Sequence, residues 1–309
     1  MVALSGATSA SGPWIARALV QRGFSVHASC PRPREAYAGR RRARLALVEG
    51  CARVAFGVRA EAGDLARWLR ELRPALFVHH HHPMEGFRSP GYDLARAREI
   101  ALRPLPELVK ALREGGARGV LFSGSYFEPG EGGTAPDAAA TPYARSKRET
   151  WEALRALAAE HGLALSKVVV PHAIAPLESE ERLVPGLLRA ARRGEPFLLR
   201  APDSLADTLP APALAESYAE AALALLAGRA SLRRPSGRVE AARDFAGRVL
   251  RELAVAELGL SPCRLELARP AGPAPAFQNP ERERQRLDWP AFWRSYAACE
   301  RRFDTLAGR

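Results

Sequence analysis

The sequence predicts an α/β fold, a doubly wound parallel sheet with a smaller α+β lobe toward its C-terminal end. Short β-prone segments alternate with amphipathic, arginine-rich helical segments through roughly the first half of the 309 residues. Parallel strands need crossovers that return the chain in the same direction, and this alternation supplies them. After about residue 171 helices dominate, and proline and glycine interrupt the chain more often. We therefore expect one domain over 1–171 and a mainly ligand-binding lobe over 172–309, partly interleaved with the first.

The elements follow from hydrophobic periodicity and from the residues that interrupt it. Val2–Ser5 is a short apolar run, and a glycine-rich turn separates it from a helical stretch over 14–22 that Gly23 ends. Pro13 suits the first turn of that helix, where its missing N–H costs nothing. Further strands are expected over 24–29, 52–56, 74–79, 119–123 and 165–171, and helices over 64–72, 94–114 and 143–161. Short isolated strands are expected in the second lobe over 197–200, 237–239 and 264–267.

The net charge and the distribution of arginine indicate which kinds of binding partner to expect. Lysine and arginine total 46 against 34 acidic residues, only three of the 46 are lysines, and the net charge is +12. The arginines are spread among alanine, leucine and glutamate, as on a solvated helix face, and aromatic residues do not interleave with them as a base-stacking surface requires. We therefore expect no nucleic-acid partner, whereas the positive field favours an anionic small molecule.

Other classes are disfavoured by features that the sequence lacks. No apolar run approaches the roughly 18 to 20 residues of a membrane span, and the N-terminal segment has neither the basic flank nor the apolar stretch of a signal peptide. The four cysteines have no C-x-x-C spacing, which speaks against a disulfide framework and against a zinc site. We expect a cytoplasmic protein with reduced thiols and no membrane association.

The turn after the first strand predicts a dinucleotide site. It reads G-A-T-S-A-S-G over residues 6–12. Glycines belong there because the backbone must turn tightly and approach a pyrophosphate, whose charge then lies at the helix N-terminus. Ser9 stands where a middle glycine is usual. The turn residues expected to bind the cofactor are Gly6, Thr8, Ser9, Ser11 and Gly12.

The end of the second predicted strand bears on the choice between NAD and NADP. An NAD site usually has an acidic residue there, but residues 29–34 read S-C-P-R-P-R and contain no carboxylate. Arg32 could instead meet a 2′-phosphate with its planar fork of donors, so NADP is favoured and NAD is the alternative. The competing interpretation of Arg32 is a solvated surface arginine. Asp64, after the third predicted strand, could accept from the adenine amino group or cap the helix that it opens.

The most specific pattern is Y-A-R-S-K over residues 143–147, at the start of a predicted helix. Residues four apart share a helix face, so the phenol of Tyr143 and the ammonium of Lys147 can point into one cleft. A free tyrosine has a pKa of about 10, and a nearby cation stabilises its phenolate, so we expect Lys147 to make Tyr143 more acidic. The competing interpretation is a surface pair, against which stands the rarity of lysine in this chain.

Two hydroxyl groups end the predicted strand upstream of that helix. Ser125 could donate to a substrate carbonyl oxygen while Tyr143 gives that oxygen a proton, which is general-acid catalysis with electrostatic help. Ser123 is the competing candidate, because serines at strand ends often only satisfy backbone groups.

Four consecutive histidines, His79–His82, end the fourth predicted strand. A run of histidines suggests a metal, but neighbours in a strand point to opposite faces, and no Asp, Glu or Cys has ligand spacing with them. We therefore expect no metal here. One or two of these side chains, His81 among them, are expected to line the cofactor cleft, while the others pack or cap the strand end.

The glycine turn, the G-D-L segment at 63–65, the serine-bearing strand end and the Y-x-x-x-K helix, in this order, resemble the extended short-chain dehydrogenase/reductases. These are the nucleotide-sugar epimerase and dehydratase group. The resemblance spans most of the chain, and it implies a Rossmann fold, an NAD(P)-dependent enzyme and a homodimer formed through the helices over 94–114 and 143–161. It implies catalytic roles for Ser125, Tyr143 and Lys147, cofactor contacts for Gly6, Gly12, Arg32, Asp64, Tyr143 and Lys147, and substrate contacts for Ser125 and His172.

The chain departs from the family's pattern at several positions. Ser9 replaces a glycine beside the pyrophosphate, and His81 and His82 replace small residues close to the expected cofactor. In the second lobe His172 stands where many members have an asparagine, and Ala206 where they often have an arginine. The positions expected at the sugar end of the substrate are therefore unlike those of an ordinary hexose nucleotide site.

These departures favour one reaction. The dehydratases that the chain resembles place an Asp-Glu pair directly after the strand-end hydroxyl, whereas Ser125 is followed by Tyr126 and Phe127. The epimerases resemble NAD users with an acid after the second strand, which is missing here. We therefore expect an NADP(H)-dependent oxidoreductase that reduces a ketone, with 4-keto sugar nucleotides as the substrate class. The alternatives are an NAD-dependent nucleotide-sugar 4-epimerase and a non-catalytic NADP-binding sensor or scaffold.

Overall fold

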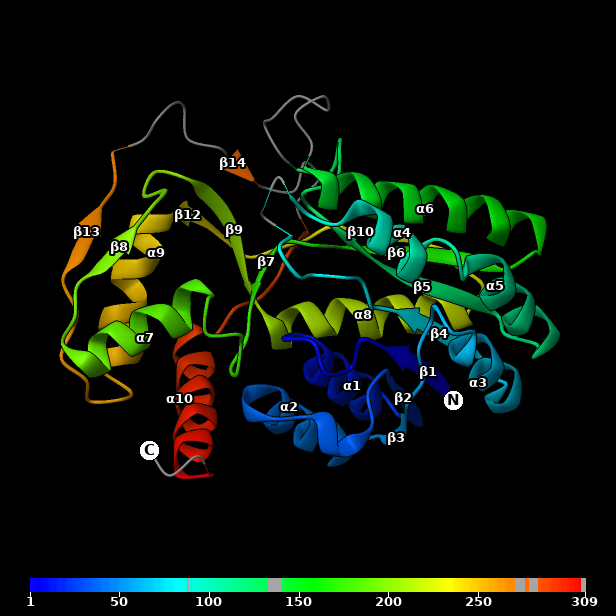
Figure 1. Cartoon of the computed structure of the whole chain (residues 1–309), viewed down its shortest axis with the longest axis horizontal. Helices are drawn as coiled ribbons and strands as arrows, with labels where there is room; N and C mark the ends of the chain where they lie inside the picture. The colour runs from blue at the N-terminus through cyan, green and yellow to red at the C-terminus, as the bar shows by residue number, and fades with distance from the viewer. Residues whose placement is uncertain (88, 90, 133–140, 270–275, 278–282, 307–309) are drawn as a thin grey trace.

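The structure is a computed structural model, and it describes residues 1–87, 89, 91–132, 141–269, 276–277 and 283–306. A seven-stranded sheet lies at its centre in the order β10-β6-β5-β4-β1-β2-β3, and its strand pairs are parallel (Figure 1). This confirms the predicted doubly wound sheet. Its strands are β1 (Val2–Ser5), β2 (Val26–Cys30), β3 (Arg53–Phe56), β4 (Leu76–His79), β5 (Gly119–Ser125), β6 (Ala164–Val170) and β10 (Leu232–Arg233).

The strand order reverses at β1. The chain runs outward from β1 through β2 to β3, returns to place β4 on the other side of β1, and continues outward through β5 and β6. The crevice beyond the carboxyl ends of β1 and β4 is therefore the topological switch point, where open α/β sheets bind their ligands. The glycine turn follows β1 directly, and the histidine run follows β4, so both lie at this point.

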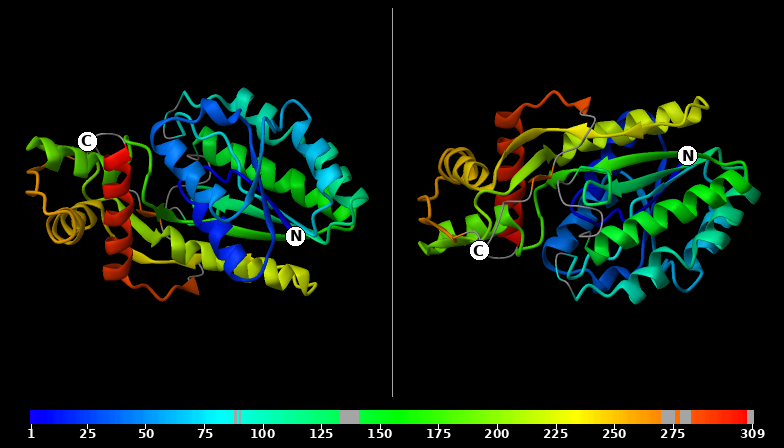
Figure 2. Two further views of the ribbon diagram at one scale, coloured as in Figure 1. Left: turned by 90° about the horizontal axis from the view of Figure 1, so that it is seen from below. Right: turned by 90° about the horizontal axis from the view of Figure 1, so that it is seen from above.

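Helices cover both faces of the sheet, and α8 and α6 lie on opposite sides of it in the right-hand view of Figure 2. Val78 packs toward α1 and α8, whereas its neighbour Phe77 packs toward α3 and α5, because successive side chains of a strand point to opposite faces. The helices are α1 (Gly12–Gln21), α2 (Gly39–Glu49), α3 (Asp64–Leu72), α4 (Leu94–Ala101), α5 (Leu105–Glu114), α6 (Pro142–Glu160) and α8 (Ala211–Leu226), with a short 3₁₀ turn at Arg34–Ala36.

The stretch over 94–114 forms two helices, so the expectation of a single helix is wrong. The first, α4, ends at Ala101, and α5 begins at Leu105. Pro104 lies between them and Pro106 lies in the first turn of α5. Proline has no N–H to donate, and its ring clashes with the preceding turn, so it ends one helix and suits the start of the next.

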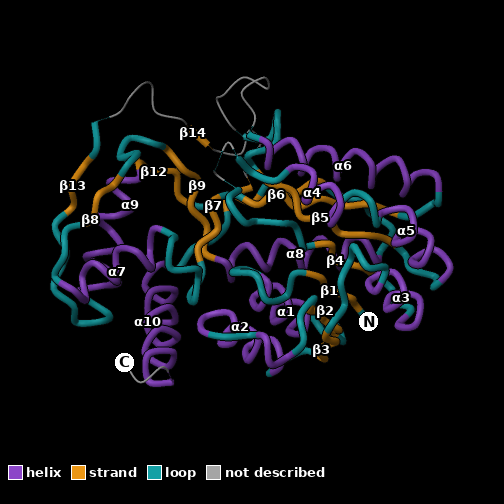
Figure 3. The backbone as a smooth tube through the Cα atoms, viewed as in Figure 1, coloured by secondary structure: helices purple, strands orange, loops and turns teal. Residues whose placement is uncertain are grey.

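In Figure 3 a second, smaller group of elements lies beside the central sheet. It has a core of its own, in which Leu187, Phe245, Trp293 and Tyr296 are buried together. The chain re-enters the first layer after residue 171, because α8 packs on the central sheet and β10 pairs with β6. The remaining elements are β7 (His172–Ile174), α7 (Leu183–Arg193), β8 (Phe197–Leu199), β9 (Leu205–Pro210), β11 (Pro235–Ser236), β12 (Arg238–Ala241), α9 (Ala242–Arg248), the π-helical segment Val249–Val255, β13 (Leu265–Leu267), β14 (Ala276–Phe277), β15 (Glu283–Arg284) and α10 (Trp289–Leu306).

Two arginines four residues apart on α2 tie this second group to the glycine turn. Arg40 donates from both terminal nitrogens to the fully buried carboxylate of Glu300 on α10, at 2.6 and 2.8 Å. Arg44 donates to the carbonyl of Thr8, at 2.8 Å, and to that of Leu177. Burial lowers the pKa of Arg44 to about 10. Leu177 adopts a left-handed φ of 63°, which is uncommon for a bulky residue, and its N–H lies 3.4 Å from Glu300 Oε1. The network thus holds both peptide groups of this strained residue.

No helix in the described part of the chain is long and apolar enough to cross a membrane. No group of three or more His, Cys, Asp or Glu side chains in it is arranged to hold a metal ion. Cys30, Cys51, Cys263 and Cys299 are free thiols.

The buried pair between Arg40 and Glu300 generates a stability prediction. Glu300→Gln removes one charge and leaves the other buried without its counter-ion, so the free energy of unfolding should fall by about 3–5 kcal/mol. Asp203→Asn, which breaks an exposed pair with Arg243, is the matched control and should cost about 1 kcal/mol or less. Urea denaturation of the three proteins at one pH measures this. Equal losses in the two variants would contradict the role of the buried pair.

Candidate active site

The glycine turn is shaped by close contact with the backbone that follows β4. Gly6 has a φ of 70°, and a Cβ there would lie 2.8 Å from the carbonyl carbon of His80 and from the nitrogen of His81. A Cβ on Gly12 would lie 2.3 Å from the carbonyl oxygen of Ala7. Both positions therefore require glycine. The first turn of α1 holds no acidic side chain, so the positive end of its dipole faces the switch point without a neutralising carboxylate, which fits a pyrophosphate.

His80 links this turn to the neighbouring strand end. Its Nε2 lies 2.9 Å from the hydroxyl of Ser11 and 3.1 Å from that of Ser9, and its Nδ1 lies 2.6 Å from the hydroxyl of Ser123. The Ser9 hydroxyl also accepts from the N–H of Gly12, at 3.0 Å, and Tyr218 donates to the Ser123 hydroxyl, at 2.6 Å. The hydroxyls that the sequence assigned to the cofactor thus face an imidazole in this structure.

The structure brings Tyr143, Lys147 and Ser125 together. Thr141 caps α6 by accepting from the N–H of Ala144, at 3.2 Å. Tyr143 and Lys147, four residues apart on this helix, are both almost fully buried. The ammonium of Lys147 donates to the backbone carbonyl of Ser123, at 2.8 Å, and the hydroxyl of Ser125 forms a hydrogen bond with the Tyr143 phenol. Ser123, the competing candidate, is occupied by His80 and Tyr218, which leaves Ser125 as the strand-end hydroxyl at the phenol.

The protonation of this group differs from the sequence-based expectation. Burial raises the pKa of Tyr143 well above its usual value, and the hydrogen bond with Ser125 only partly opposes this. Burial also lowers the pKa of Lys147 to about 8, against the opposing effect of the Glu128 carboxylate. Lys147 therefore does not make the phenol more acidic in this structure, because desolvation dominates both groups.

A buried ion cluster behind Ser125 was not found by sequence reasoning. Glu128 accepts from the N–H of Ser125, at 2.6 Å, and from the ammonium of Lys167, at 2.7 Å; Lys167 also donates to Glu131, at 2.8 Å. A Cβ on Gly124 would lie 2.3 Å from Cε of Lys167, so the lysine stem passes directly over that glycine. The cluster fixes the end of β5, where Ser125 lies, and the loop that follows it. The one feature of the sequence that could have indicated this cluster is that Lys167 is one of only three lysines in the chain.

Aromatic side chains enclose the Tyr143 ring. Phe87, Tyr92 and His82 meet it edge-on, with ring centroids 5.5, 5.8 and 5.6 Å away. The Nε2 of His82 lies 2.8 Å from the hydroxyl of Ser146, and that hydroxyl donates to the carbonyl of Tyr143, at 2.8 Å. These rings keep bulk water from the phenol, which is why burial governs its pKa.

The histidine run is neutral, with His79 buried and His80, His81 and His82 partly buried. Burial lowers the pKa of His80 to about 3 and that of His81 to about 4, and Lys147 adds to both shifts. The pKa values of His79 and His82 are also lowered, mainly by burial. His79 and His81 stack with centroids 4.4 Å apart, and His81 Nδ1 lies 2.9 Å from the hydroxyl of Ser5. His79 and His81 pack at the strand end, whereas His80 reaches the glycine turn and His82 reaches Tyr143.

The other residues assigned from sequence lie outside this group of contacts. Arg32 is exposed in the loop after β2. Asp64 is the first residue of α3, whose N-cap is Gly63, and it pairs with Arg67 at 3.3 Å, so the capping interpretation is wrong. His172 lies on β7, with its Nδ1 3.3 Å from the hydroxyl of Thr208 on β9.

Comparison with known proteins identifies the family of the chain. Residues 2–206 match the NAD dependent epimerase/dehydratase family. The chain belongs to this family. It is an enzyme of the extended short-chain dehydrogenase/reductase type. No curated protein matches the sequence.

The solved structures that resemble the chain share its fold at low identity. The dTDP-glucose 4,6-dehydratase DesIV from Streptomyces venezuelae, solved with NAD, has a TM-score of 0.75 and 18% identity, covering 99% of this chain and 98% of that one. A UDP-glucose 4-epimerase from Thermus thermophilus, solved with NAD, has a TM-score of 0.66 and 19% identity, covering 96% and 92%. A UDP-glucose 4-epimerase from Thermotoga maritima, solved with UDP-glucose, has a TM-score of 0.73 and 13% identity, covering 97% and 98%.

The neutral histidine run predicts sensitivity to acid. The unfolded chain takes up protons on these histidines near pH 6.5, whereas the folded chain takes them up only near pH 4 and below. The free energy of unfolding should therefore fall as the pH falls from 6.5 toward 4, by up to about 1.4 kcal/mol per pH unit for each buried histidine. His80→Gln should remove one such contribution from that slope, measured by urea denaturation between pH 7 and 4.5. His161→Gln, outside the run, is the control and should leave the slope unchanged. An unchanged slope in His80→Gln would refute the assignment.

Proposed function

We propose that the protein is an NADP(H)-dependent reductase of a ketone, with 4-keto sugar nucleotides as its substrate class. The observation that carries the proposal is the hydrogen-bonded contact between the Ser125 hydroxyl and the Tyr143 phenol inside a ring of aromatic side chains. Two hydroxyl donors in one dry site can receive the negative charge that develops on a carbonyl oxygen during reduction.

The protonation state supports reduction in particular. A phenol whose pKa is raised by burial stays protonated at neutral pH, so Tyr143 can give its proton to the substrate oxygen. Ser125 donates a hydrogen bond to the same oxygen, and Glu128 keeps the backbone of Ser125 in place. Lys147, held by the Ser123 carbonyl, is suited to bind the ribose hydroxyls of the nicotinamide. NADPH, when bound, supplies the hydride.

The turn and its surroundings fit a dinucleotide at the pyrophosphate end. The glycine positions allow no side chain, the α1 N-terminus has no carboxylate, and Arg44 adds a buried cation at Thr8. The preference for NADP rests on Arg32, which is exposed after β2 with no carboxylate among residues 29–34. The solved relatives named above that carry a dinucleotide have NAD, so NAD is the alternative cofactor.

A second candidate function is a non-catalytic NADP-binding sensor or scaffold. The observation that favours it is the bulk of His82, whose ring meets the Tyr143 ring where the family usually has a small residue. In that case the protein binds NADPH and turns over no carbonyl compound. The remaining alternative, an NAD-dependent nucleotide-sugar 4-epimerase, interconverts its substrate with no net consumption of NADPH.

The proposed reaction predicts a specific loss on removal of the phenol. Purified protein with NADPH and a panel of 4-keto-6-deoxy sugar nucleotides should show oxidation of NADPH, followed by absorbance. Tyr143→Phe should lower kcat/KM by roughly 10²- to 10⁴-fold, because it removes the proton donor. Tyr296→Phe, a buried tyrosine in the second core, is the matched control and should change it by less than about twofold. Activity retained in Tyr143→Phe would exclude the proposed role, and NADPH binding without turnover would favour the sensor.

The cofactor preference predicts a separate effect. Arg32→Ala should raise the KM for NADPH about tenfold or more and leave that for NADH nearly unchanged, because only NADPH carries the 2′-phosphate that a guanidinium can bind. Arg53→Ala, at the amino end of the adjacent strand β3, serves as the control. Equal changes for both cofactors would show that Arg32 does not read the 2′-phosphate.

A further inference from the structure

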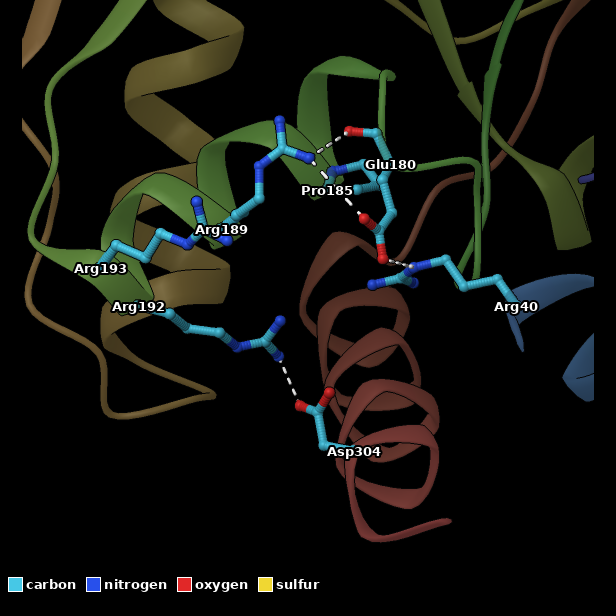
Figure 4. A pocket seen from close by; sticks show the side chains of 7 residues that line it. All are labelled: Arg40, Glu180, Pro185, Arg189, Arg192, Arg193 and Asp304. Atoms are coloured by element: carbon cyan, nitrogen blue, oxygen red, sulfur yellow. Dashed lines mark hydrogen bonds and ion pairs between the residues drawn. The ribbon is translucent and has the colours of Figure 1, made fainter. Parts of the chain in front are cut away.

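A cavity of about 410 Å³ lies where α2, α7 and α10 meet, on the seam between the two groups of elements. Its volume falls in the range of sites that bind small molecules. It is separate from the switch point, since none of its lining residues belongs to the glycine turn or the histidine run. The residues that line it are Arg40, Glu180, Pro185, Arg189, Arg192, Arg193 and Asp304 (Figure 4).

We propose that this cavity is a second ligand site, for a small phosphorylated compound that also carries hydroxyl groups, such as a sugar phosphate. The proposal does not rest on the function proposed above. It depends on the charge of the cavity wall and on two buried polar atoms of lining residues that have no hydrogen-bond partner among the described residues.

The wall carries more positive than negative charge, and the ion pairs of Glu180 are loose. Four guanidinium groups face two carboxylates. The pairs of Glu180 with Arg189 and Arg40 measure 3.8 and 4.0 Å, longer than a hydrogen bond. In Figure 4 the side chains of Arg40 and Arg189 approach Glu180 from opposite sides. A phosphate can use donors that these pairs leave unsaturated, because guanidinium groups bind phosphate oxygens with two donors each.

The unsatisfied donor belongs to Arg40. Its side chain is only 9% exposed, and Glu300 engages both of its terminal nitrogens. Its Nε has no hydrogen-bond partner among the described residues, and the carboxylate oxygen of Glu180 lies 4.0 Å away. A buried N–H without an acceptor carries a cost that an acceptor in the cavity would remove.

The unsatisfied acceptor belongs to Asp304 on α10. Its Oδ2 accepts from Arg192, at 2.6 Å, while its Oδ1 is buried and has no hydrogen-bond partner among the described residues. A simple anion such as sulfate, which carries no proton to donate at neutral pH, satisfies only the arginine side of the cavity. A hydroxyl group on the same ligand can donate to Asp304 Oδ1, and this points to a hydroxylated phosphate compound.

A ligand in this cavity would contact side chains from both groups of elements. Arg40 lies on α2, one helical turn from Arg44, which holds the carbonyl of Thr8 in the glycine turn. Arg192 and Asp304 belong to the second group of elements. A ligand that bridges these side chains joins the two groups, and it should raise the melting temperature by binding only the folded state.

Isothermal titration calorimetry with α-D-glucose 1-phosphate and with sulfate tests the proposal. The titrations are run at constant ionic strength with saturating NADPH, so that the glycine turn is occupied. We expect saturable binding of the sugar phosphate at one site per chain. Arg189→Gln/Arg192→Gln should weaken it by tenfold or more. Asp304→Asn should lower the affinity for the sugar phosphate relative to that for sulfate by about threefold or more, because the sugar phosphate has hydroxyl groups that donate to Oδ1 and sulfate has none.

The control is Arg22→Gln/Arg243→Gln, which removes two exposed arginines and changes the net charge equally. It should bind the sugar phosphate as the wild type does. If the double variant of the cavity has a lower melting temperature, Arg189→Lys/Arg192→Lys keeps the charge and should bind more tightly than the glutamine variant. Three results would overturn the proposal: no saturable binding, equal weakening in the cavity and control variants, or affinity that does not change in either cavity variant.

Discussion

The site depends on two ammonium groups that the fold holds in its interior, at the end of β5. Lys147 donates to the Ser123 carbonyl, and Lys167 donates to the carboxylates of Glu128 and Glu131. A charge removed from water is tolerated only where partners surround it, so each lysine forces an oxygen into a fixed place. These oxygens lie on the end of β5 and on the loop that follows Ser125. The chain uses arginine almost everywhere else, which makes the burial of two of its three lysines at one site a structural requirement rather than a matter of composition.

Desolvation sets the chemistry of the surrounding groups. Burial raises the pKa of Tyr143 and lowers those of Lys147 and the histidine run, so the site at neutral pH holds a protonated phenol beside uncharged imidazoles. Neutral imidazoles can act as both donor and acceptor, and His80 uses this to connect Ser9 and Ser11 to Ser123. The histidines therefore take part in the hydrogen bonding of the switch point, where the family usually has small or apolar residues.

Buried arginines, each surrounded by oxygen acceptors, also connect the two groups of elements. Arg40 and Arg44 reach from one face of α2 into buried carboxylate and carbonyl oxygens, and they hold Leu177 in a conformation that it would not adopt alone. The carbonyl of Thr8 is one of those oxygens, so the glycine turn and the seam are connected through a single helix.

The sequence alone was sufficient for the doubly wound sheet and the glycine turn, because these follow from local periodicity and from the glycines that follow a strand. It also placed Tyr143 and Lys147 on one helix, but the acidity that their spacing predicted for the phenol was wrong. It was insufficient for the break at Pro104, where backbone chemistry overrode a continuous apolar pattern. Only the tertiary structure decided the direction of the Tyr143 pKa, the partners of His80, and the union of Glu128, Glu131 and Lys167, since each depends on burial or on contact between residues far apart in the chain. Periodicity reports which face of an element is apolar, but it does not report how much water the packed elements exclude.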